Sequence, residues 1–248
     1  TNHHVVSGAI KVEPRWSPLL KRDIKADIFS IINVDFFDYR WKSRGVGAHA
    51  IQADIVTYSK EEDLALVRLR SDTSPPSVAK LYPRDKEHEL RATMSVYCVG
   101  AGLGEYPVIT DGMLSQFGVD IDNKEFWLHT APSIFGNSGG GLFLASTNEL
   151  VGVPARIGVS YSSGAITHLS YAIPISRVYK FLEAERYRFV YDAAYTEASE
   201  EAERKRLRAE SEKRMLVAPD KTMDSERDPR DEELPFGPPS RQGQEHDR

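Results

Sequence analysis

Short stretches rich in β-branched and aromatic residues, separated by turn residues, make up most of this chain. Two of the clearest span residues 28–37 and 47–58, and neither shows helical periodicity. Similar short stretches with turn signals continue to about Ile173. This pattern predicts a chain built mostly of short β-strands. Because 40% of the 248 residues are hydrophobic, the chain can bury one sizeable core or two small ones.

A glycine-rich segment within this pattern carries the strongest chemical signal. Residues 135–140 read Phe-Gly-Asn-Ser-Gly-Gly, so glycines stand on both sides of one hydroxyl, that of Ser138. Glycine permits a sharp backbone turn, and free N–H groups beside a hydroxyl are what an oxyanion hole requires. We therefore interpret Ser138 as a candidate nucleophile, with Gly136, Asn137 and Ser138 as the candidate oxyanion hole. A serine also needs a histidine base and a carboxylate to orient that base.

Both partners occur upstream of the serine. Residues 1–6 read Thr-Asn-His-His-Val-Val, and residues 63–66 read Asp-Leu-Ala-Leu. Together with the serine segment, they resemble the three motifs of trypsin-like serine proteases, most closely those of the HtrA type. The resemblance implies that His4 is the general base, Asp63 the orienting carboxylate and Ser138 the nucleophile, in the chain order of chymotrypsin-type enzymes. It implies no cofactor and no metal.

The resemblance covers residues 1–185 and implies the all-β chymotrypsin fold, which has two six-stranded antiparallel β-barrels and a C-terminal α-helix. We expect a first barrel within residues 1–75 and a second within residues 84–175, joined by a proline-containing linker. In this family the histidine motif follows the first strands, whereas here it opens the chain. The sequence therefore resembles a fragment or a processed product, and we expect an N-terminally truncated first barrel.

Two segments within the region of resemblance have further local predictions. The stretch between His4 and Asp63 is longer than the resemblance implies, and we place the excess in a proline-containing loop over residues 12–22. A helix is predicted from Ile175, with Ser176 as its N-cap and a dense set of aromatic residues packing it onto the second barrel. That aromatic set comprises Tyr179, Phe181, Tyr187, Phe189, Tyr191 and Tyr195.

The C-terminal part differs in composition from the rest. Residues 186–215 are predicted to form a charged, solvated helical extension, with i,i+4 pairs Glu200/Arg204 and Glu201/Lys205. Charges and prolines predict disorder over residues 216–248. HtrA proteins usually carry a PDZ module after the protease domain, and these residues lack the apolar strand pattern that it would need.

Other residues near the motifs were weighed for the same roles. Asp54 and Glu62 are rivals of Asp63, but the Asp-Leu-Ala-Leu frame favours Asp63. The Thr-x-x-His spacing selects His4 over His3, which we expect to be an exposed neighbour. Gly-x-Ser-x-Gly also occurs in α/β-hydrolases, but there a helix follows the serine and the histidine comes last in the chain. Here a short strand and a hairpin follow Ser138, so that alternative is disfavoured.

The substrate pocket is expected beside the nucleophile. In trypsin-like folds, residues just ahead of the serine floor the pocket, and an acid six positions earlier selects Lys or Arg. Pro132 occupies that position here, so a basic P1 side chain would be buried unpaired. We predict a small or medium aliphatic P1 residue. His168 could instead contact an acidic P1 residue, although a surface position in a hairpin is the favoured interpretation. The expected pocket residues are Pro132, Ser133, Val153, Pro154 and Ala155.

Composition narrows the function class. A net charge of −5 argues against nucleic-acid binding. The single cysteine, Cys98, excludes an internal disulfide framework and is expected to be a small buried hydrophobe. No apolar run approaches the ~18 residues of a membrane span, and no metal-ligand spacing occurs. A polypeptide is the expected substrate, and the sequence does not indicate the compartment.

These features lead to one principal hypothesis and two alternatives. The principal one is a serine endopeptidase that acts through a covalent acyl-enzyme. The first alternative is a catalytically inactive, protease-like module that binds a partner through the cleft or the charged tail. The second is a maturation protease whose tail docks on an assembly, for which the sequence offers no docking motif.

Overall fold

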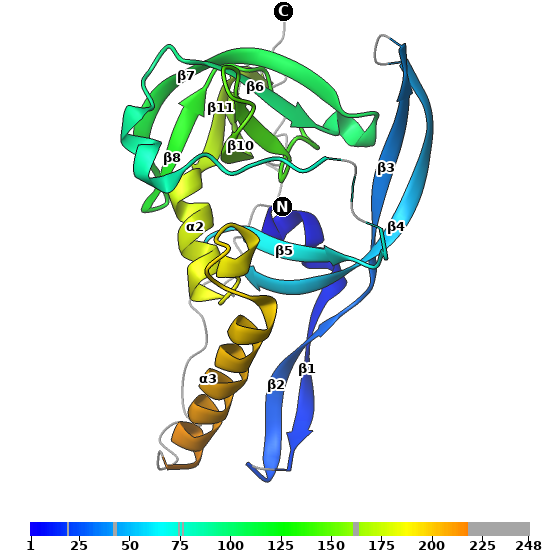
Figure 1. The fold of residues 1–248 in the computed structure, drawn as a ribbon, viewed down its shortest axis with the longest axis vertical. Coiled ribbons are helices and arrows are strands. Elements are labelled where there is room, and N and C mark those ends of the chain that lie inside the picture. The colour runs from blue at the N-terminus through cyan, green and yellow to red at the C-terminus, as the bar shows by residue number, and fades with distance from the viewer. Residues whose placement is uncertain (19, 42–43, 74, 76, 161–163, 218–248) are drawn as a thin grey trace, which may run out of the picture.

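The computed structural model describes residues 1–217 except residues 19, 42–43, 74, 76 and 161–163, so most of the predicted disordered tail lies outside it. The chain forms one closed barrel, two open sheets and a set of C-terminal helices (Figure 1). The strands are β1 (Ile10–Ser17), β2 (Arg22–Phe29), β3 (Ile32–Arg40), β4 (Arg44–Ser59), β5 (Leu64–Leu69), β6 (Ser95–Gly100), β7 (Val108–Ile121), β8 (Lys124–His129), β9 (Gly141–Leu144), β10 (Leu150–Ser160) and β11 (Gly164–Pro174). The helices are α1 (His3–Val6), η1 (Ser7–Ala9), η3 (Arg84–Glu89), η4 (Gly102–Gly104), α2 (Ile175–Ala184), η5 (Arg188–Val190) and α3 (Glu197–Val217).

The second half of the chain forms the closed barrel. Its six strands follow the order β10-β11-β8-β7-β6-β9, and each pairs antiparallel with its neighbours. The prediction of a six-stranded antiparallel barrel in this half is confirmed. Alternating residues of β6 face the interior, among them Val96 and Cys98. Cys98 is fully buried, as expected, and burial raises the pKa of its thiol. A thiol in this environment is packed as a small hydrophobe.

The first half does not form a second closed barrel within the described residues. β3, β4 and β5 make a three-stranded sheet, and β1 and β2 make a separate two-stranded sheet. The expectation of two barrels is therefore wrong for this structure. β4 is 16 residues long, and with β3 it extends beside the barrel as an arm (Figure 1). The arm contacts the barrel at its far end, where the Phe37 and Tyr106 rings lie 5.0 Å apart.

Two local predictions for this half are also wrong. Residues 12–22 are not an irregular loop, because most of them belong to the β1–β2 hairpin. Pro14 is compatible with a strand here because β1 pairs only with β2, which leaves its other edge open. Residues 28–37 do not form one strand either. The chain breaks between β2 and β3, and the N–H of Ser30 donates to the Ala9 carbonyl at 2.8 Å.

α2 follows the last barrel strand and packs beneath the barrel. Tyr179 is buried in the same cluster as Cys98 and Leu142, whereas Phe181 is buried in a second cluster with Phe126. The predicted packing of this aromatic helix onto the barrel is thus confirmed for these residues. The predicted cap is not. Pro174 stands at the N-cap and makes no side-chain cap bond, because its ring carries no hydrogen-bond acceptor.

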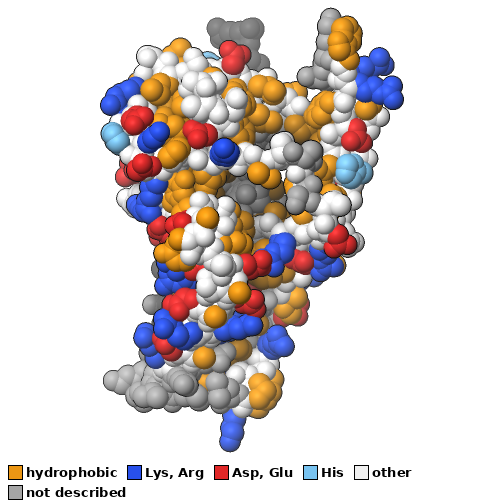
Figure 2. All heavy atoms as spheres, viewed as in Figure 1, with side chains coloured by type: hydrophobic (Ala, Val, Ile, Leu, Met, Phe, Trp, Pro, Cys, Tyr) orange, Lys and Arg blue, Asp and Glu red, His pale blue; other side chains and the backbone are white. Residues whose placement is uncertain are grey.

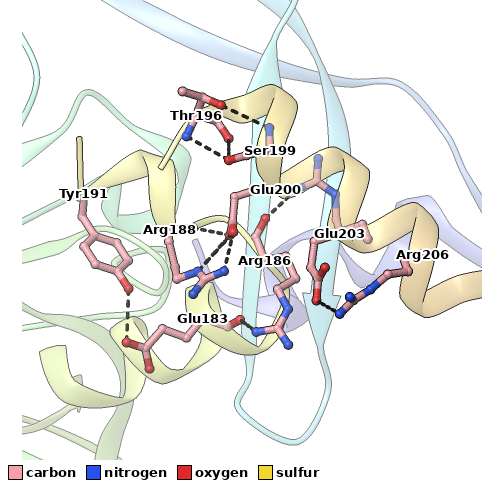
Figure 3. A network of polar contacts seen from close by, with 10 residues as sticks. Glu183, Arg186, Arg188, Tyr191, Thr196, Ser199, Glu200, Glu203 and Arg206 are labelled. Carbon is pink, nitrogen blue, oxygen red and sulfur yellow. Dashed lines mark hydrogen bonds and ion pairs between the residues drawn. The ribbon is translucent and has the colours of Figure 1, made fainter. Parts of the chain in front are cut away.

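α3 is anchored to the rest of the molecule at its first turns (Figure 3). The i,i+4 spacing predicted that Glu200 pairs with Arg204. Instead, Glu200 is only 1% exposed and has a different partner. The Glu200 carboxylate accepts two hydrogen bonds from Arg188, one from Nη2 at 2.6 Å and one from the backbone N–H at 3.1 Å. Arg204 lies over the Tyr187 ring at 4.2 Å. The predicted pair of Glu201 with Lys205 is present at 2.7 Å.

The outer surface of α3 remains highly charged. Figure 2 shows Lys, Arg, Asp and Glu side chains interspersed over this part of the molecule. The helix is therefore solvated along its outer side and anchored at its start, and the sequence patterns did not predict the anchor. The physical reason is the long-range contact with Arg188, which i,i+4 spacing cannot reveal.

Candidate active site

The imidazole of His4 lies against the carboxylate of Asp63. Nδ1 of His4 is 2.8 Å from Oδ2 and 3.1 Å from Oδ1 of Asp63. An ionised carboxylate can only accept, so Nδ1 carries the proton in this hydrogen bond and Nε2 has a free lone pair. The His4 side chain is 47% exposed and that of Asp63 is 27% exposed. The pair is therefore open to solvent and to a ligand.

The backbone around Asp63 holds this pair in place. The N–H of His4 donates to Asp63 Oδ1 at 3.0 Å, and the side-chain amide of Asn2 donates to the Asp63 carbonyl at 2.9 Å. Asp63 itself has a φ of +52°, in the left-handed region that few non-glycine residues adopt. Such a conformation persists where surrounding bonds determine it. The short helix α1 and the turn before β5 thus form one hydrogen-bonded unit.

Ser138 lies in a turn between β8 and β9 of the barrel. Gly136 and Gly139 both have positive φ, +100° and +76°. At Gly136 a Cβ would come within 2.5 Å of the Ala101 carbonyl oxygen, so glycine is required there for space as well as for conformation. The N–H of Gly139 donates to the Pro154 carbonyl at 2.9 Å, which fixes the turn against β10.

The N–H groups of this turn fall into two kinds. The N–H of Asn137 donates to the Ile134 carbonyl at 3.1 Å, whereas those of Gly136 and Ser138 have no acceptor among the described residues. The Asn137 side chain points inward and is 2% exposed, and its Oδ1 accepts from the Ile134 N–H at 3.3 Å. Asn137 therefore supports the turn from within. Of the three predicted oxyanion-hole residues, only Gly136 and Ser138 keep N–H groups free for an anion.

A cavity of about 400 Å³ joins the two halves of the site. Both His4 and Ser138 line it, although they lie far apart along the chain. The other lining residues are Ser133, Ile134, Phe135, Asn137, Pro154, Ala155, Arg156, Ile157 and Val159. Among the described residues that line it, none carries a carboxylate.

Three of the five predicted pocket residues line this cavity, and two do not. Ser133, Pro154 and Ala155 are part of the wall. Pro132 is not, and its carbonyl accepts from Thr110 Oγ1 at 2.7 Å. Val153 is 5% exposed and packs in the core with Phe126. Val153 thus faces the barrel interior, and neither residue lines this cavity.

Several wall residues were missed by the sequence analysis. Ile157 and Val159 follow Ala155 at two-residue spacing on β10, so strand alternation could have identified them. Arg156 lies between Ala155 and Ile157 and lines the same cavity, beside a register shift between Pro154 and Arg156. Its guanidinium is paired with Asp122, with Nη1 2.7 Å from Oδ2.

The rival residues have other partners. Asp54 receives two hydrogen bonds from Arg70, at 2.7 and 2.9 Å, and Glu62 receives Nε of Arg177 at 2.7 Å. His3 is not an exposed neighbour, because its ring stacks on Tyr58 with centroids 5.0 Å apart. Burial is the main cause that lowers the pKa of His3.

Three remaining predictions concern His168, metal binding and membrane spans. His168 is exposed on β11 and does not line the cavity. Within the described part of the chain, no three His, Cys, Asp or Glu side chains cluster closely enough to hold a metal ion. None of the helices described is both long and apolar enough to cross a membrane.

Comparisons with known proteins show that the chain is similar to trypsin-like peptidases. Residues 1–153 match the family model described as "Trypsin-like peptidase domain". Over 128 residues the chain is 30% identical to the "Probable periplasmic serine endoprotease DegP-like" of Pseudomonas fluorescens, which covers 50% of this chain and 25% of that protein. The chain thus spans only a quarter of that relative.

Solved structures are also similar to this chain, at low sequence identity. A variant of the HtrA-type protease AlgW with a tripeptide matches with a TM-score of 0.52 and 22% identity, over 74% of this chain and 50% of that one. A serine endoprotease from Yersinia pestis matches with a TM-score of 0.45 and 22% identity, over 55% of this chain and 44% of that one.

Proposed function

The chain belongs to the trypsin-like peptidase domain family, and on that premise we propose that it is a serine endopeptidase that uses His4, Asp63 and Ser138. The family implies a polypeptide substrate. One observation carries the assignment of residues. Nδ1 of His4 lies 2.8 Å from the Asp63 carboxylate, while His4 and Ser138 line a single cavity. The contact and the shared cavity support the assignment, because a base needs an acid to orient it and must lie near its nucleophile.

The proposed reaction is a two-step acyl transfer. Nε2 of His4 takes the proton of Ser138 Oγ as that oxygen attacks the scissile carbonyl, and Asp63 stabilises the resulting imidazolium. The free N–H groups of Gly136 and Ser138 bind the oxyanion. His4 then returns its proton to the leaving amine as the carbon–nitrogen bond breaks. Water repeats the sequence on the acyl-enzyme and releases the acid.

We further propose that the cavity accepts a small or medium aliphatic P1 side chain. Ile157, Val159 and Ala155 supply apolar wall, and the described wall offers no carboxylate to a basic side chain. Arg156 in that wall carries the same sign of charge as such a side chain, and its guanidinium is itself paired with Asp122.

Labelling with a fluorophosphonate, which reacts with activated serines, tests the proposal directly. We expect labelling of Ser138, no labelling of Ser138→Ala and a large loss of labelling in His4→Ala. Two substitutions serve as matched controls. Ser115→Ala removes an exposed barrel serine, and His49→Ala removes a histidine whose Nδ1 lies 3.8 Å from the Asp38 carboxylate. Both should keep wild-type labelling.

The same experiment separates the alternative function. A protein with a folded circular-dichroism spectrum that is not labelled at Ser138, and does not cleave unfolded casein, would be a protease-like binding module. Equal labelling of wild-type and His4→Ala protein would remove His4 from the mechanism.

A further inference from the structure

We infer that Arg177 is a positioning residue that holds the turn bearing Asp63 in register with the barrel bearing Ser138. The inference rests on the proposed function, since it assigns Arg177 a role through Asp63. Arg177 lies in α2, and its side chain is only 10% exposed. No sequence motif pointed to it. Its importance is visible only from its partners.

Arg177 binds the residue that precedes Asp63 in two ways. Nε donates to Glu62 Oε2 at 2.7 Å, and Nη2 donates to the Glu62 carbonyl at 3.3 Å. That carbonyl belongs to the peptide group joining Glu62 to Asp63. Its orientation therefore sets the plane from which the Asp63 side chain projects. The contact has a direct geometric route to the carboxylate that receives His4.

Asn2 and His4 bind the carbonyl and the carboxylate of Asp63, but they do not bind the peptide group between Glu62 and Asp63. The N–H of Asp63 donates to the Lys60 carbonyl at 3.4 Å, which is long for an amide hydrogen bond. Asp63 nonetheless has a φ of +52°. A non-glycine residue keeps such a conformation when surrounding contacts over-determine it. Arg177 supplies one of those contacts from outside the turn.

The other side of Arg177 is fixed to the barrel. Nη1 donates to the Glu125 carbonyl on β8 at 2.8 Å, and the guanidinium lies 5.1 Å from the centroid of the Phe126 ring. The Arg156 guanidinium lies 5.2 Å from the centroid of that same ring, and Arg156 lines the cavity. Figure 1 shows α2 descending from the barrel to the level of β5. Arg177 thus bridges the two parts that supply the site.

The chemistry of the side chain suits this bridge. A guanidinium is planar and directs several N–H donors along fixed axes, so one group can bind Glu62 and Glu125 together. A lysine carries the same charge but cannot present this fork. The two substitutions Arg177→Met and Arg177→Lys therefore separate loss of charge from loss of geometry.

The test measures the second-order rate constant for fluorophosphonate labelling of Ser138. We expect Arg177→Met to lower it ~10–100-fold, as a misplaced catalytic group does, with a partial loss in Arg177→Lys. Arg188→Met is the matched control, because Arg188 also pairs with a poorly exposed glutamate, Glu200, away from the Asp63 turn. That variant should label within about twofold of wild type.

A double substitution distinguishes positioning from general destabilisation. If Arg177 acts through Asp63, adding Arg177→Met to Asp63→Asn should change the labelling rate by no more than about twofold. Full additivity of the two losses would overturn the inference, as would wild-type labelling of Arg177→Met.

A second variant and the wild-type protein complete the test. Glu62→Ala removes the carboxylate that Nε of Arg177 binds and leaves the Glu62 carbonyl to Nη2, so it tests whether the guanidinium needs its shorter bond to stay in place. It carries the test if Arg177→Met does not fold: a loss of about tenfold supports the inference, and wild-type labelling overturns it. Absence of labelling in the wild-type protein would contradict the proposed function itself, and Arg177 would then have no reaction to support.

Discussion

Asp63 receives His4 through two different groups, the backbone N–H at 3.0 Å and the ring Nδ1 at 2.8 Å. The backbone bond fixes where His4 begins, and the side-chain bond fixes how its ring is turned. Nε2 is consequently the nitrogen left without a protein partner at this pair. Binding at two points gives one orientation to a side chain that is otherwise exposed to solvent.

The proposal predicts a large effect of Asp63→Asn. The asparagine keeps an oxygen for the His4 N–H but places a donor toward the ring, so the imidazole takes the wrong tautomer. We expect kcat to fall by ~10⁴-fold, the loss seen when a triad aspartate is neutralised in this way. Hydrolysis of a fluorogenic peptide measures it. Asp54→Asn, which affects a carboxylate bonded to Arg70, should retain activity; an equal loss in both variants would contradict the role of Asp63.

The turn before the nucleophile predicts a specific effect of Gly136→Ala. The residue has a φ of +100°, and the new Cβ would approach the Ala101 carbonyl oxygen to 2.5 Å, so the peptide must move. Loss of one oxyanion donor raises the barrier by about 2.7–4 kcal/mol, a ~10²–10³-fold fall in kcat.

Gly118→Ala provides the control for this prediction. Gly118 also has a positive φ, +65°, but a Cβ there would meet nothing within 4 Å. It should lower stability slightly through backbone strain and leave kcat unchanged. A wild-type kcat in Gly136→Ala, measured with the same peptide, would exclude Gly136 from the oxyanion hole.

The cavity wall predicts the order of P1 preference. Peptides with Val, Ala or Leu at P1 should be cleaved well, and those with Arg or Lys poorly. A basic side chain would meet Arg156 and no carboxylate among the described wall residues, and burying an unpaired charge is costly. A peptide library read by mass spectrometry gives the order. Efficient cleavage after Arg or Lys would show that the substrate does not enter this cavity.

A buried histidine predicts a pH dependence of stability. His129 is fully buried in the barrel, where neither ring nitrogen meets hydrogen-bond geometry with a described residue, although the Ala131 backbone interacts with the ring and opposes part of the pKa shift. Burial lowers its pKa from 6.5 to about 4. Between pH 6.5 and about pH 4 the unfolded chain binds a proton at His129 that the folded chain does not. Stability contributed by neutral His129 is therefore complete above pH 6.5 and falls by ~3 kcal/mol as the pH drops to about 4.

Urea unfolding at several pH values checks this prediction. His129→Leu removes the titrating group without leaving a hydrogen bond unpaired, so the variant should lose less stability than wild type between neutral pH and pH 4. His88→Leu, which removes an exposed histidine of η3, should keep the wild-type slope. Identical slopes in all three proteins would mean that His129 is protonated in the folded state.

Much of the barrel could be predicted from the sequence because its strands carry a local signal. Short apolar stretches with turn signals predicted strands through the second half, and the resemblance to trypsin-like proteases implied that six of them form an antiparallel barrel. The predicted helix at Ile175 likewise matches the start of α2. The segment over residues 12–22 was misread because proline usually argues against a strand. That rule does not apply to β1, which has one open edge.

The residue types of the candidate site were also readable from the chain. Three short motifs singled out His4, Asp63 and Ser138, because each has a local frame that its chemistry needs. The tertiary structure alone decided which of their neighbours take part. It directed the Asn137 side chain into the core, Val153 into the barrel interior and Arg156 to the cavity wall. The sequence determines which groups are available, whereas only folding across long separations decides which of them meet, as in Glu62 with Arg177 or Arg188 with Glu200. Such contacts depend on packing between distant elements, and no spacing along the chain records them.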